Sequence, residues 1–420
     1  MGNNLTAQTK TKLIARYAVI ISGMYLIMGS KVFAAALFNH IVQPYVATAL
    51  AYDSNVLRLP DNFIPGPDTS GNKTTRDSFI KQIKAGLAAK WQISQQQIQA
   101  DVSVDQNWYS TYNELNYTGY NILGRWNWRI GQKFKGEISY NRRLALSNFR
   151  QINRLIPNLE NEQHYVANGA YEIIQDWFLH AGFVRDSTHF PALERQQSNL
   201  REVSKEFGLR YTNQIENMLD FRVTITDGKY TSRGDLTELA ILLDNAYTRT
   251  NYDLNGVWNY SVKTRFRGQI GYVSQEFKHL KNRNFSDITA SGDILWLATA
   301  KSSLLLEAWR EIAIADSLTA SFSLNQGIRL TPTWTWSETP KIQLELPMSY
   351  EQQTSLGLNS DPTTSIQQKA DQSIIRLNLN YTPIPNFEMT AFTAYENRHS
   401  NNPLHSYQDQ MTGLNMKISF

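Results

Sequence analysis

Arginine residues stand at every second or fourth position in several segments of this sequence. Arg125 and Arg129 form one such pair, and Arg265 and Arg267 form another. In a β-strand, residues two or four apart lie on the same face, so the guanidinium groups of each pair point to one side. Guanidinium groups gathered in a site of reduced dielectric pair with carboxylates, so the pattern predicts recognition of anionic solutes or an acidic polymer.

Other segments alternate in the same way, and together they predict one polar surface on which cations outnumber acids. Its expected charged members are Lys84, Lys90, Asp101, Asp105, Arg125, Arg129, Lys135, Glu137, Glu206, Arg210, Asp220, Arg222, Arg265, Arg267, Arg329, Glu345 and Arg376. The candidate pore-lining residues are the arginines of this set: Arg125, Arg129, Arg210, Arg222, Arg265, Arg267, Arg329 and Arg376. Two interpretations remain open, because these arginines could select anions or could pair with acids across strands to stiffen the wall.

The sequence gives little support for a catalytic site. Cysteine is absent, which excludes thiol catalysis, thiolate metal sites and disulfides. His164 and His180 fall on expected strands without a recognisable carboxylate and serine nearby, and Asp53-Ser54-Asn55 lacks the spaced acids of a calcium loop, so a turn is expected there. We predict no enzyme, no metal and no cofactor. A hydrolase whose serine and histidine meet from separate strands stays open as an alternative.

The elements that position these residues follow from alternation with period two. Between 342 and 350, apolar Ile342, Leu344 and Leu346 alternate with polar residues. Similar patterns predict about 18 strands. Their ranges are 42–53, 79–93, 97–110, 117–131, 134–146, 163–174, 177–187, 200–213, 217–228, 246–260, 264–276, 285–299, 303–314, 319–336, 341–353, 368–382, 386–397 and 406–420.

Short turns alternate with long polar connections such as 54–78, 147–162, 229–245 and 354–367. This asymmetry is typical of outer-membrane β-barrels, which have tight periplasmic turns and long outer loops. We therefore predict an all-β fold, a closed antiparallel transmembrane barrel from 41 to 420 with about 18 strands and 16 as the fallback. The 12% aromatic and 19% charged composition fits a barrel better than the alternative, a soluble β protein.

The N-terminus has the pattern of a secretory signal peptide. Lys10, Lys12 and Arg16 precede an apolar stretch from 17 to 28, and small residues follow, so we predict a signal at 1–34 with cleavage near Ala34 to Ala36. An uncleaved anchor is the alternative. The segment 1–34 carries four basic residues and no acid, so its removal takes the formal net charge from +4 to about zero and leaves no support for nucleic-acid binding.

The C-terminus is an alternating strand that ends on Phe420. This resembles the signal by which outer-membrane barrels are recognised by the barrel insertion machinery. Tyr52, Trp91, Trp108, Trp177, Tyr260, Trp334 and Trp336 lie near expected strand ends, where aromatic girdles contact lipid and water. The predicted location is the outer membrane of a Gram-negative bacterium, reached through the Sec pathway, with outer-membrane lipid around the barrel.

Several segments resemble the exosortase-B-associated exopolysaccharide-biosynthesis outer-membrane proteins, over about residue 41 to the end. The resemblance implies a barrel that exports polysaccharide beside other polysaccharide synthesis and export proteins, and it supplies no established site residue. The alternatives are a general porin for small solutes and a non-conducting surface barrel that binds polysaccharide. The segments that carry the resemblance are Tyr52-Asp53-Ser54-Asn55-Val56-Leu57-Arg58-Leu59-Pro60-Asp61, Leu115-Asn116-Tyr117-Thr118-Gly119-Tyr120-Asn121, Trp309-Arg310-Glu311, Asp316-Ser317-Leu318-Thr319-Ala320-Ser321, Leu330-Thr331-Pro332-Thr333-Trp334 and Ser400-Asn401-Asn402-Pro403-Leu404.

Overall fold

The computed structural model describes residues 42–60, 63, 75–150, 152, 154–233, 244–314, 320–357 and 368–420. The predicted signal at 1–34, His40, Asp61 and the run 316–319 lie outside the described residues. None of the helices in the described part of the chain has the length and apolar character of a membrane span.

Strands make up almost all of the described chain. They are β1 Val42–Asp53, β2 Ser78–Ile93, β3 Gln96–Tyr109, β4 Tyr117–Ile130, β5 Phe134–Leu146, β6 Leu159–Ile174, β7 Trp177–His189, β8 Leu200–Thr212, β9 Met218–Tyr230, β10 Ala246–Ser261, β11 Thr264–Phe277, β12 Phe285–Trp296, β13 Ser302–Ile314, β14 Ala320–Glu338, β15 Lys341–Glu345, β16 Met348–Gly357, β17 Gln368–Ile384, β18 Phe387–Ser400 and β19 Tyr407–Ser419. Four short 3-10 helices lie in the outer loops: η1 Asn113–Leu115, η2 Leu193–Ser198, η3 Lys281–Arg283 and η4 Pro403–His405.

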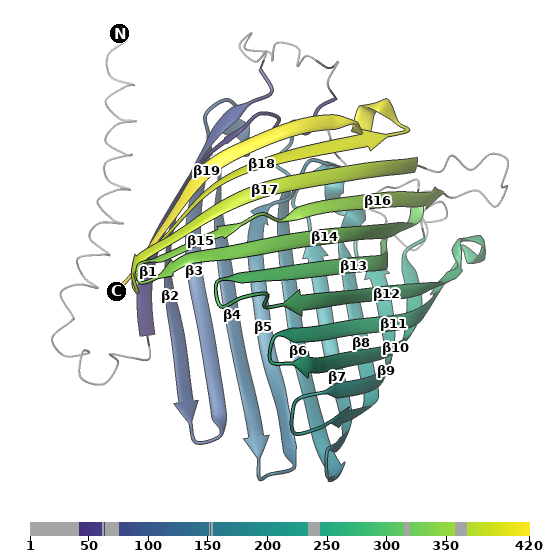
Figure 1. The fold of residues 1–420 in the computed structure, drawn as a ribbon. Helices are drawn as coiled ribbons and strands as arrows, with labels where there is room; N and C mark the ends of the chain where they lie inside the picture. Colours follow the sequence, from purple (N-terminus) through teal and green to yellow (C-terminus); the bar gives the residue numbers. More distant parts are fainter. Residues whose placement is uncertain are drawn as a thin grey trace, which may run out of the picture.

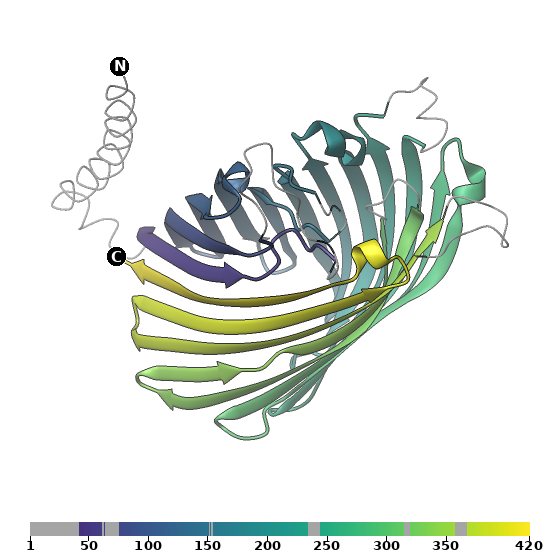
Figure 2. The ribbon, with the colours of Figure 1, turned by 90° about the horizontal axis from the view of Figure 1, so that it is seen from above.

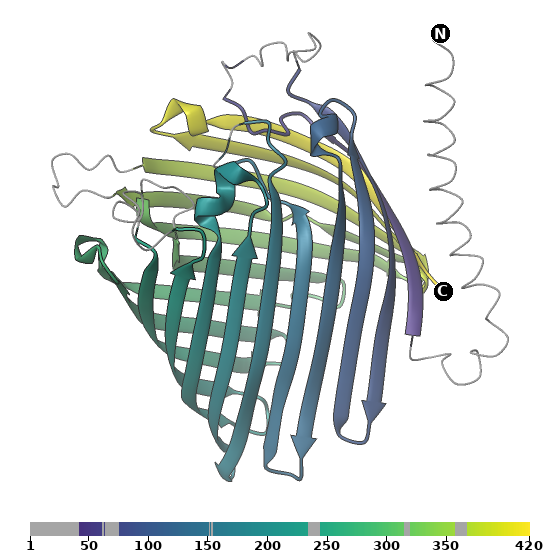
Figure 3. The ribbon, with the colours of Figure 1, turned by 180° about the vertical axis from the view of Figure 1, so that it is seen from behind.

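The sheet closes on itself as an antiparallel barrel of 18 strands (Figure 1). Each strand pairs with its neighbours in sequence, and β1 pairs with both β2 and β19. Figure 3 shows β2 to β9 as one half of the wall, Figure 1 shows β10 to β19 as the other, and Figure 2 shows both halves around a common interior. Because closure removes every sheet edge, the backbone is satisfied within the barrel, as a bilayer requires.

β15 and β16 together occupy one strand position in the barrel, so the wall has 18 strand positions, as predicted. Both pair with β14 and with β17, and the register of β15 continues into β16. Between them lies Pro347, and Pro332 on β14 faces Leu346, whose amide donates to the Pro332 carbonyl at 3.1 Å. Proline has no amide hydrogen, so two prolines close together interrupt the ladder without shifting it.

The register separates a lipid face from a lumenal face. On β2, Phe79, Ile83 and Leu87 are 58%, 50% and 45% exposed, and the even-numbered residues from 80 to 86 are more covered. Residues opposite one another on paired strands share a face, so this assignment extends around the whole barrel. A closed barrel with an apolar outer surface is the architecture of an outer-membrane protein.

The strand ends differ from prediction in a few places. β6 begins at Leu159 and not at 163, so the third outer loop is shorter than expected. β16 extends to Gly357, four residues beyond the expected end. Phe420 follows β19, and its amide donates to the Pro44 carbonyl at 2.8 Å, which ties the C-terminus to β1.

Candidate functional site: the lumen and its outer mouth

The register places all the predicted arginines on the lumenal face. Four of them are in ion pairs there: Arg125 with Glu137 (3.5 Å), Arg210 with Asp220 (3.3 Å), Arg267 with Asp293 (2.7 Å) and Arg329 with Glu307 (3.6 Å). These pairs join neighbouring strands, as the wall-stiffening interpretation expects.

The predicted excess of cations does not hold for the whole lumenal face. Along the described strands, acids on this face outnumber cations once every strand is included. Acids that the sequence pattern missed include Glu162, Asp186, Glu202, Asp253, Asp287, Asp293, Glu307, Glu311, Glu351, Glu388, Glu396 and Asp409. They were missed because their strands do not alternate cleanly between polar and apolar residues, so only the register reveals which way they point.

Arg129, Arg222, Arg265 and Arg376 form no ion pair within the described residues. The Nε atoms of Arg222 and Arg265 are buried without a hydrogen-bond partner. Arg376 lies 4.1 Å from the Phe392 ring centroid and donates to Asn378 at 2.7 Å. Positive charge without an ion-pair partner is therefore confined to a few positions of the described lumenal wall.

One cationic hollow lies where β2 to β5 meet the periplasmic turns. Its volume is about 580 Å³, and Arg129, Lys135 and Arg210 line it together with Gln97. The Lys135 ammonium also lies 4.3 Å from the Phe178 ring centroid. Glu137 also lines this hollow, and Arg210 is paired with Asp220, but the lining cations outnumber the lining acid, so the hollow can attract an anionic group.

A second hollow of about 650 Å³ is built mainly on β10 to β14, and Trp309 is among its lining residues. The Trp309 Nε1 donates to Glu351 at 3.1 Å, and the Arg329 guanidinium lies 5.5 Å from the ring centroid. Gly327 faces Trp309 across the strand pair, and a Cβ there would lie 2.4 Å from the indole, so only glycine permits this close approach. Trp309 was not among the residues predicted from the sequence to line the pore.

Two histidines gain carboxylate partners that local sequence did not show. His164 Nδ1 lies 2.5 Å from Asp186, and His180 Nε2 lies 2.6 Å from Asp220. Of the carboxylate and serine pattern that the sequence did not show, the described residues supply the carboxylate alone. Asp186 is the direct partner of His164 on the neighbouring strand β7, whereas His180 on β7 reaches past β8 to Asp220 on β9, and a linear pattern reveals neither contact. No hydrogen bond from a serine to either ring is seen in the described residues, and no cluster of histidine and acidic side chains there could hold a metal.

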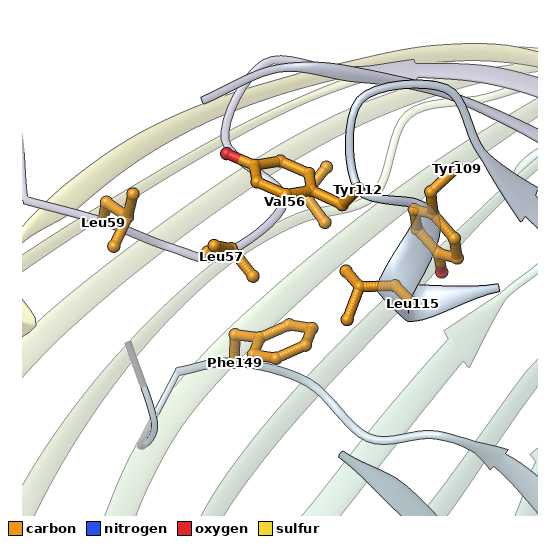
Figure 4. Close-up of a cluster of buried hydrophobic side chains, with 7 residues drawn as sticks. All are labelled: Val56, Leu57, Leu59, Tyr109, Tyr112, Leu115 and Phe149. Atoms are coloured by element: carbon orange, nitrogen blue, oxygen red, sulfur yellow. The ribbon is translucent and has the colours of Figure 1, made fainter. Parts of the chain in front are cut away.

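The outer mouth is narrowed by an apolar cluster on the inner side of the wall (Figure 4). The segment 54–60 turns inward as soon as β1 ends. Its first turn is fixed by Asp53, whose carboxylate accepts from the Asn55 amide at 2.9 Å, in agreement with the expected turn. The cluster consists of Val56, Leu57, Leu59, Tyr109, Tyr112, Leu115 and Phe149, all nearly fully buried.

Arg58 fixes this inward segment to the barrel seam, by which we mean the part of the wall formed by β18, β19 and β1. Its guanidinium lies 3.2 Å from Asp53, 3.0 Å from Asp409 and 3.7 Å from Glu396. Burial disfavours the charged guanidinium, but the three carboxylates outweigh that effect and raise the pKa of Arg58. Arg58 adopts a φ of 54°, the left-handed region, so backbone strain is tolerated to place this side chain.

The β5–β6 loop reaches the same seam from another side of the mouth. Arg150 lies 3.1 Å from Glu396 on β18, and the His405 ring lies near the Arg150 backbone, with its Nδ1 buried without a hydrogen-bond partner in the described part of the chain. Burial and the nearby Arg398 lower the pKa of His405. A signal for this narrowing exists in the sequence, because Val56, Leu57 and Leu59 are apolar residues in an expected polar loop.

Comparison with known proteins gives similarity of fold alone. No family model matches the chain, and no curated protein matches it. Similar solved structures include the outer membrane protein OpdK of Pseudomonas aeruginosa (TM-score 0.48, 10% identity, 90% of this chain and 99% of that chain). Others are OccAB3 of Acinetobacter baumannii (0.47, 10%, 90% and 99%) and OccK2 of Pseudomonas aeruginosa in complex with glucuronate (0.48, 8%, 90% and 98%). At these scores the similarity carries no inference about what this chain binds or transports.

Proposed function

We propose that this outer-membrane β-barrel passes an exopolysaccharide across the outer membrane, with Trp309 as a lumenal contact for the sugar rings. The observation that carries the proposal is the lumenal hollow that Trp309 lines together with hydrogen-bonding side chains. Asn255, Gln269 and Ser291 line the same hollow.

This combination suits a carbohydrate. The C–H face of a pyranose ring packs on an aromatic face, and its hydroxyls exchange hydrogen bonds with planar polar groups around the rim. The ion pairs of Arg267 with Asp293 and of Arg329 with Glu307 present both donors and acceptors on the same wall. A chain of sugars can therefore replace water contacts step by step as it moves through the lumen.

The cationic hollow at the periplasmic turns adds a preference for acidic sugars. A polymer made in the cell meets Arg129, Lys135 and Arg210 first, because they lie at the end from which it enters. Fixed positive charge raises the local concentration of anionic groups. The polymer that fits both hollows is one with carboxylate or other acidic substituents.

The resemblance to exosortase-B-associated proteins supports the same role and suggests polysaccharide synthesis and export proteins as partners. In this proposal the chain is exported through the Sec pathway, and the barrel insertion machinery recognises the strand that ends at Phe420. No catalytic step is part of the proposed function.

Deletion and complementation test the proposal. A strain that lacks the gene should retain polymer inside the cell, and the wild-type gene should restore secretion. Trp309→Ala should reduce secretion severalfold, since an aromatic contact contributes about 1 kcal/mol, and Trp309→Phe should restore much of it. Normal secretion by the deletion strain would reject the proposal, and a defect confined to nutrient uptake would indicate a general porin.

The narrowed mouth favours a second candidate, a surface barrel that binds polysaccharide with its outer loops while the lumen stays closed. The apolar cluster and the Arg58 network both hold loops across the opening. Conductance of purified protein in planar bilayers separates the candidates. Steady ion current supports passage, whereas a silent barrel that still binds polymer supports the surface role.

A further inference from the structure

The lipid face of the barrel carries a group of cations on β5 to β9. We define the cationic patch as Arg142, Arg185, Arg201, Lys205 and Lys229. Elsewhere on the described lipid face, cations are scattered: Lys81 lies between Leu50 and Trp108, and Lys369 lies two residues from Asp371. The patch is therefore a local feature of one part of the wall.

The register shows how the patch is arranged. Arg201 and Lys229 are direct partners across β8 and β9. Val203 follows Arg201 by two residues along β8, toward the periplasm, and it faces Arg185. Lys205 follows by two more residues and faces Phe183. Because direct partners share a face, all these cations point outward. Arg201 and Lys229 lie at the end of their strands nearest the outer loops, and Lys205 lies near the middle of β8.

Like charges directly opposite each other destabilise a strand pair unless an anion lies between them. Asp227 is the acid within this region, and it also accepts from Thr248 at 3.2 Å. Across the described residues no carboxylate lies within ion-pair distance of Arg185, Arg201 or Lys205. The positive charge of the patch is thus left largely uncompensated by the protein.

Tyrosines near the patch indicate its position along the bilayer normal. Arg142 lies 5.4 Å from the Tyr120 ring centroid, and Arg185 lies 5.9 Å from that of Tyr165. Tyr140 and Tyr165 are direct partners with ring centroids 4.5 Å apart. Such rings form the girdle between the apolar band and the polar layer, so Arg142 and Arg185 lie at the level of lipid headgroups.

An apolar hollow of about 670 Å³ lies on the same outer face, with Lys205 and Phe183 at its upper end, toward the patch, and Gln96, Ile130 and Phe134 beside the periplasmic turns. Small residues on β6 and β7, Ala167, Gly169 and Ala181, form its floor, and larger side chains form its sides. Lys205 lines its edge, so the cationic patch and the hollow are continuous. The large side chains are Trp126, Trp128, Ile130, Phe134, Ile138, Phe183 and Phe207.

We propose that this surface binds a phosphorylated glycolipid of the outer leaflet, the lipopolysaccharide type, with its phosphates on the cationic patch and an acyl chain in the hollow. Guanidinium and ammonium groups pair with phosphate by charge-assisted hydrogen bonds. The hollow gives an acyl chain the apolar contacts that a free phosphate ion does not use. The site lies outside the lumen and is independent of the proposed passage of polymer.

Binding of purified lipid A tests the site. Wild-type protein in detergent is mixed with diphosphorylated lipid A or with its dephosphorylated form, and the complex is measured by native mass spectrometry. We expect the variant Arg185→Gln/Arg201→Gln/Lys205→Gln/Lys229→Gln to bind the diphosphorylated form at least about tenfold more weakly than wild type. The control Lys81→Gln/Lys369→Gln removes lipid-face cations outside the patch and should bind as wild type does.

A second variant tests the hollow separately. Ala181→Phe fills the floor and leaves every cation in place, so it should also weaken binding severalfold. Heat-modifiable migration reports folding of each variant. Equal binding by the four-cation variant, equal binding of dephosphorylated lipid A, unchanged binding by Ala181→Phe, or displacement of lipid A by millimolar inorganic phosphate would each overturn the proposal.

Discussion

The guanidinium of Arg150 lies 3.1 Å from the carboxylate of Glu396, although the two residues belong to parts of the wall that are not neighbours in the sheet. Arg150 follows β5, and Glu396 lies on the lumenal face of β18. Glu396 also accepts from Tyr407 at 2.7 Å and lies 3.7 Å from Arg58. One carboxylate therefore joins two outer loops to the barrel seam and holds the mouth narrow.

Replacing Arg150 should widen the mouth. Its side chain is about one third exposed, so the ion pair contributes roughly 0.2–1 kcal/mol, and Arg150→Ala should raise the conducting fraction of single-channel recordings up to about fivefold. Glu396 keeps Tyr407 as a partner, so the barrel itself should fold normally.

Lys281→Ala is the matched control for Arg150→Ala, because it removes a cation from an outer loop with no part in the seam. Its recordings should equal those of wild type. An unchanged current for Arg150→Ala as well would mean that the mouth is held by the apolar cluster alone.

Lower pH should also open the outer mouth, because His405 becomes protonated. Burial and Arg398 lower the pKa of His405 in the closed mouth, whereas a released loop would have a histidine near its ordinary pKa. The released state therefore takes up the proton first, and closure loses stability as pH falls below about 6.5. Conductance recorded from pH 8 to 5 should rise more for wild type than for His405→Gln, which keeps the carboxylates of Asp53, Glu396 and Asp409 around Arg58. A fall in conductance with acid would contradict this sign.

The barrel could be predicted from sequence because period-two alternation and alternating connection lengths are properties of single segments. Segments such as 219–226 and 375–381 keep their apolar residues on one face, and the register of β9 and β17 agrees with this. A lipid face must be apolar along its length, so it leaves a strong local signal.

The contents of the lumen were less predictable, since a watery interior tolerates polar and apolar residues alike. Trp309 meets Glu351 from another strand, and His180 meets Asp220 from a strand 40 residues away, so each contact depends on register. The inward segment 54–60 depends on packing between separate loops, for which no periodic pattern exists.

The two faces of one strand should respond oppositely to a new charge. Leu254 points to lipid and is 42% exposed, whereas Asn255 points to the lumen at nearly the same depth. Arginine near the middle of the apolar band costs about 2–4 kcal/mol, so Leu254→Arg should lower the free energy of unfolding in lipid vesicles by that amount. Asn255→Arg should change it little. Equal losses in the two variants would show that the assigned faces are wrong for β10.

The last prediction concerns the lumenal arginines without ion-pair partners, Arg129, Arg222, Arg265 and Arg376. Their replacement by glutamine leaves no carboxylate unpaired, so the folded, heat-modifiable band should persist. Fixed charge controls ions within about 8 Å at physiological salt, and acids outnumber cations along the lumenal face as a whole, so the reversal potential should shift toward cation preference. Arg185→Gln is the control, because it makes the same kind of substitution once on the lipid face and should leave the reversal potential unchanged. If the fourfold variant kept wild-type selectivity and polymer secretion, these arginines would have no part in transport, and loss of the folded band would reject their lumenal placement.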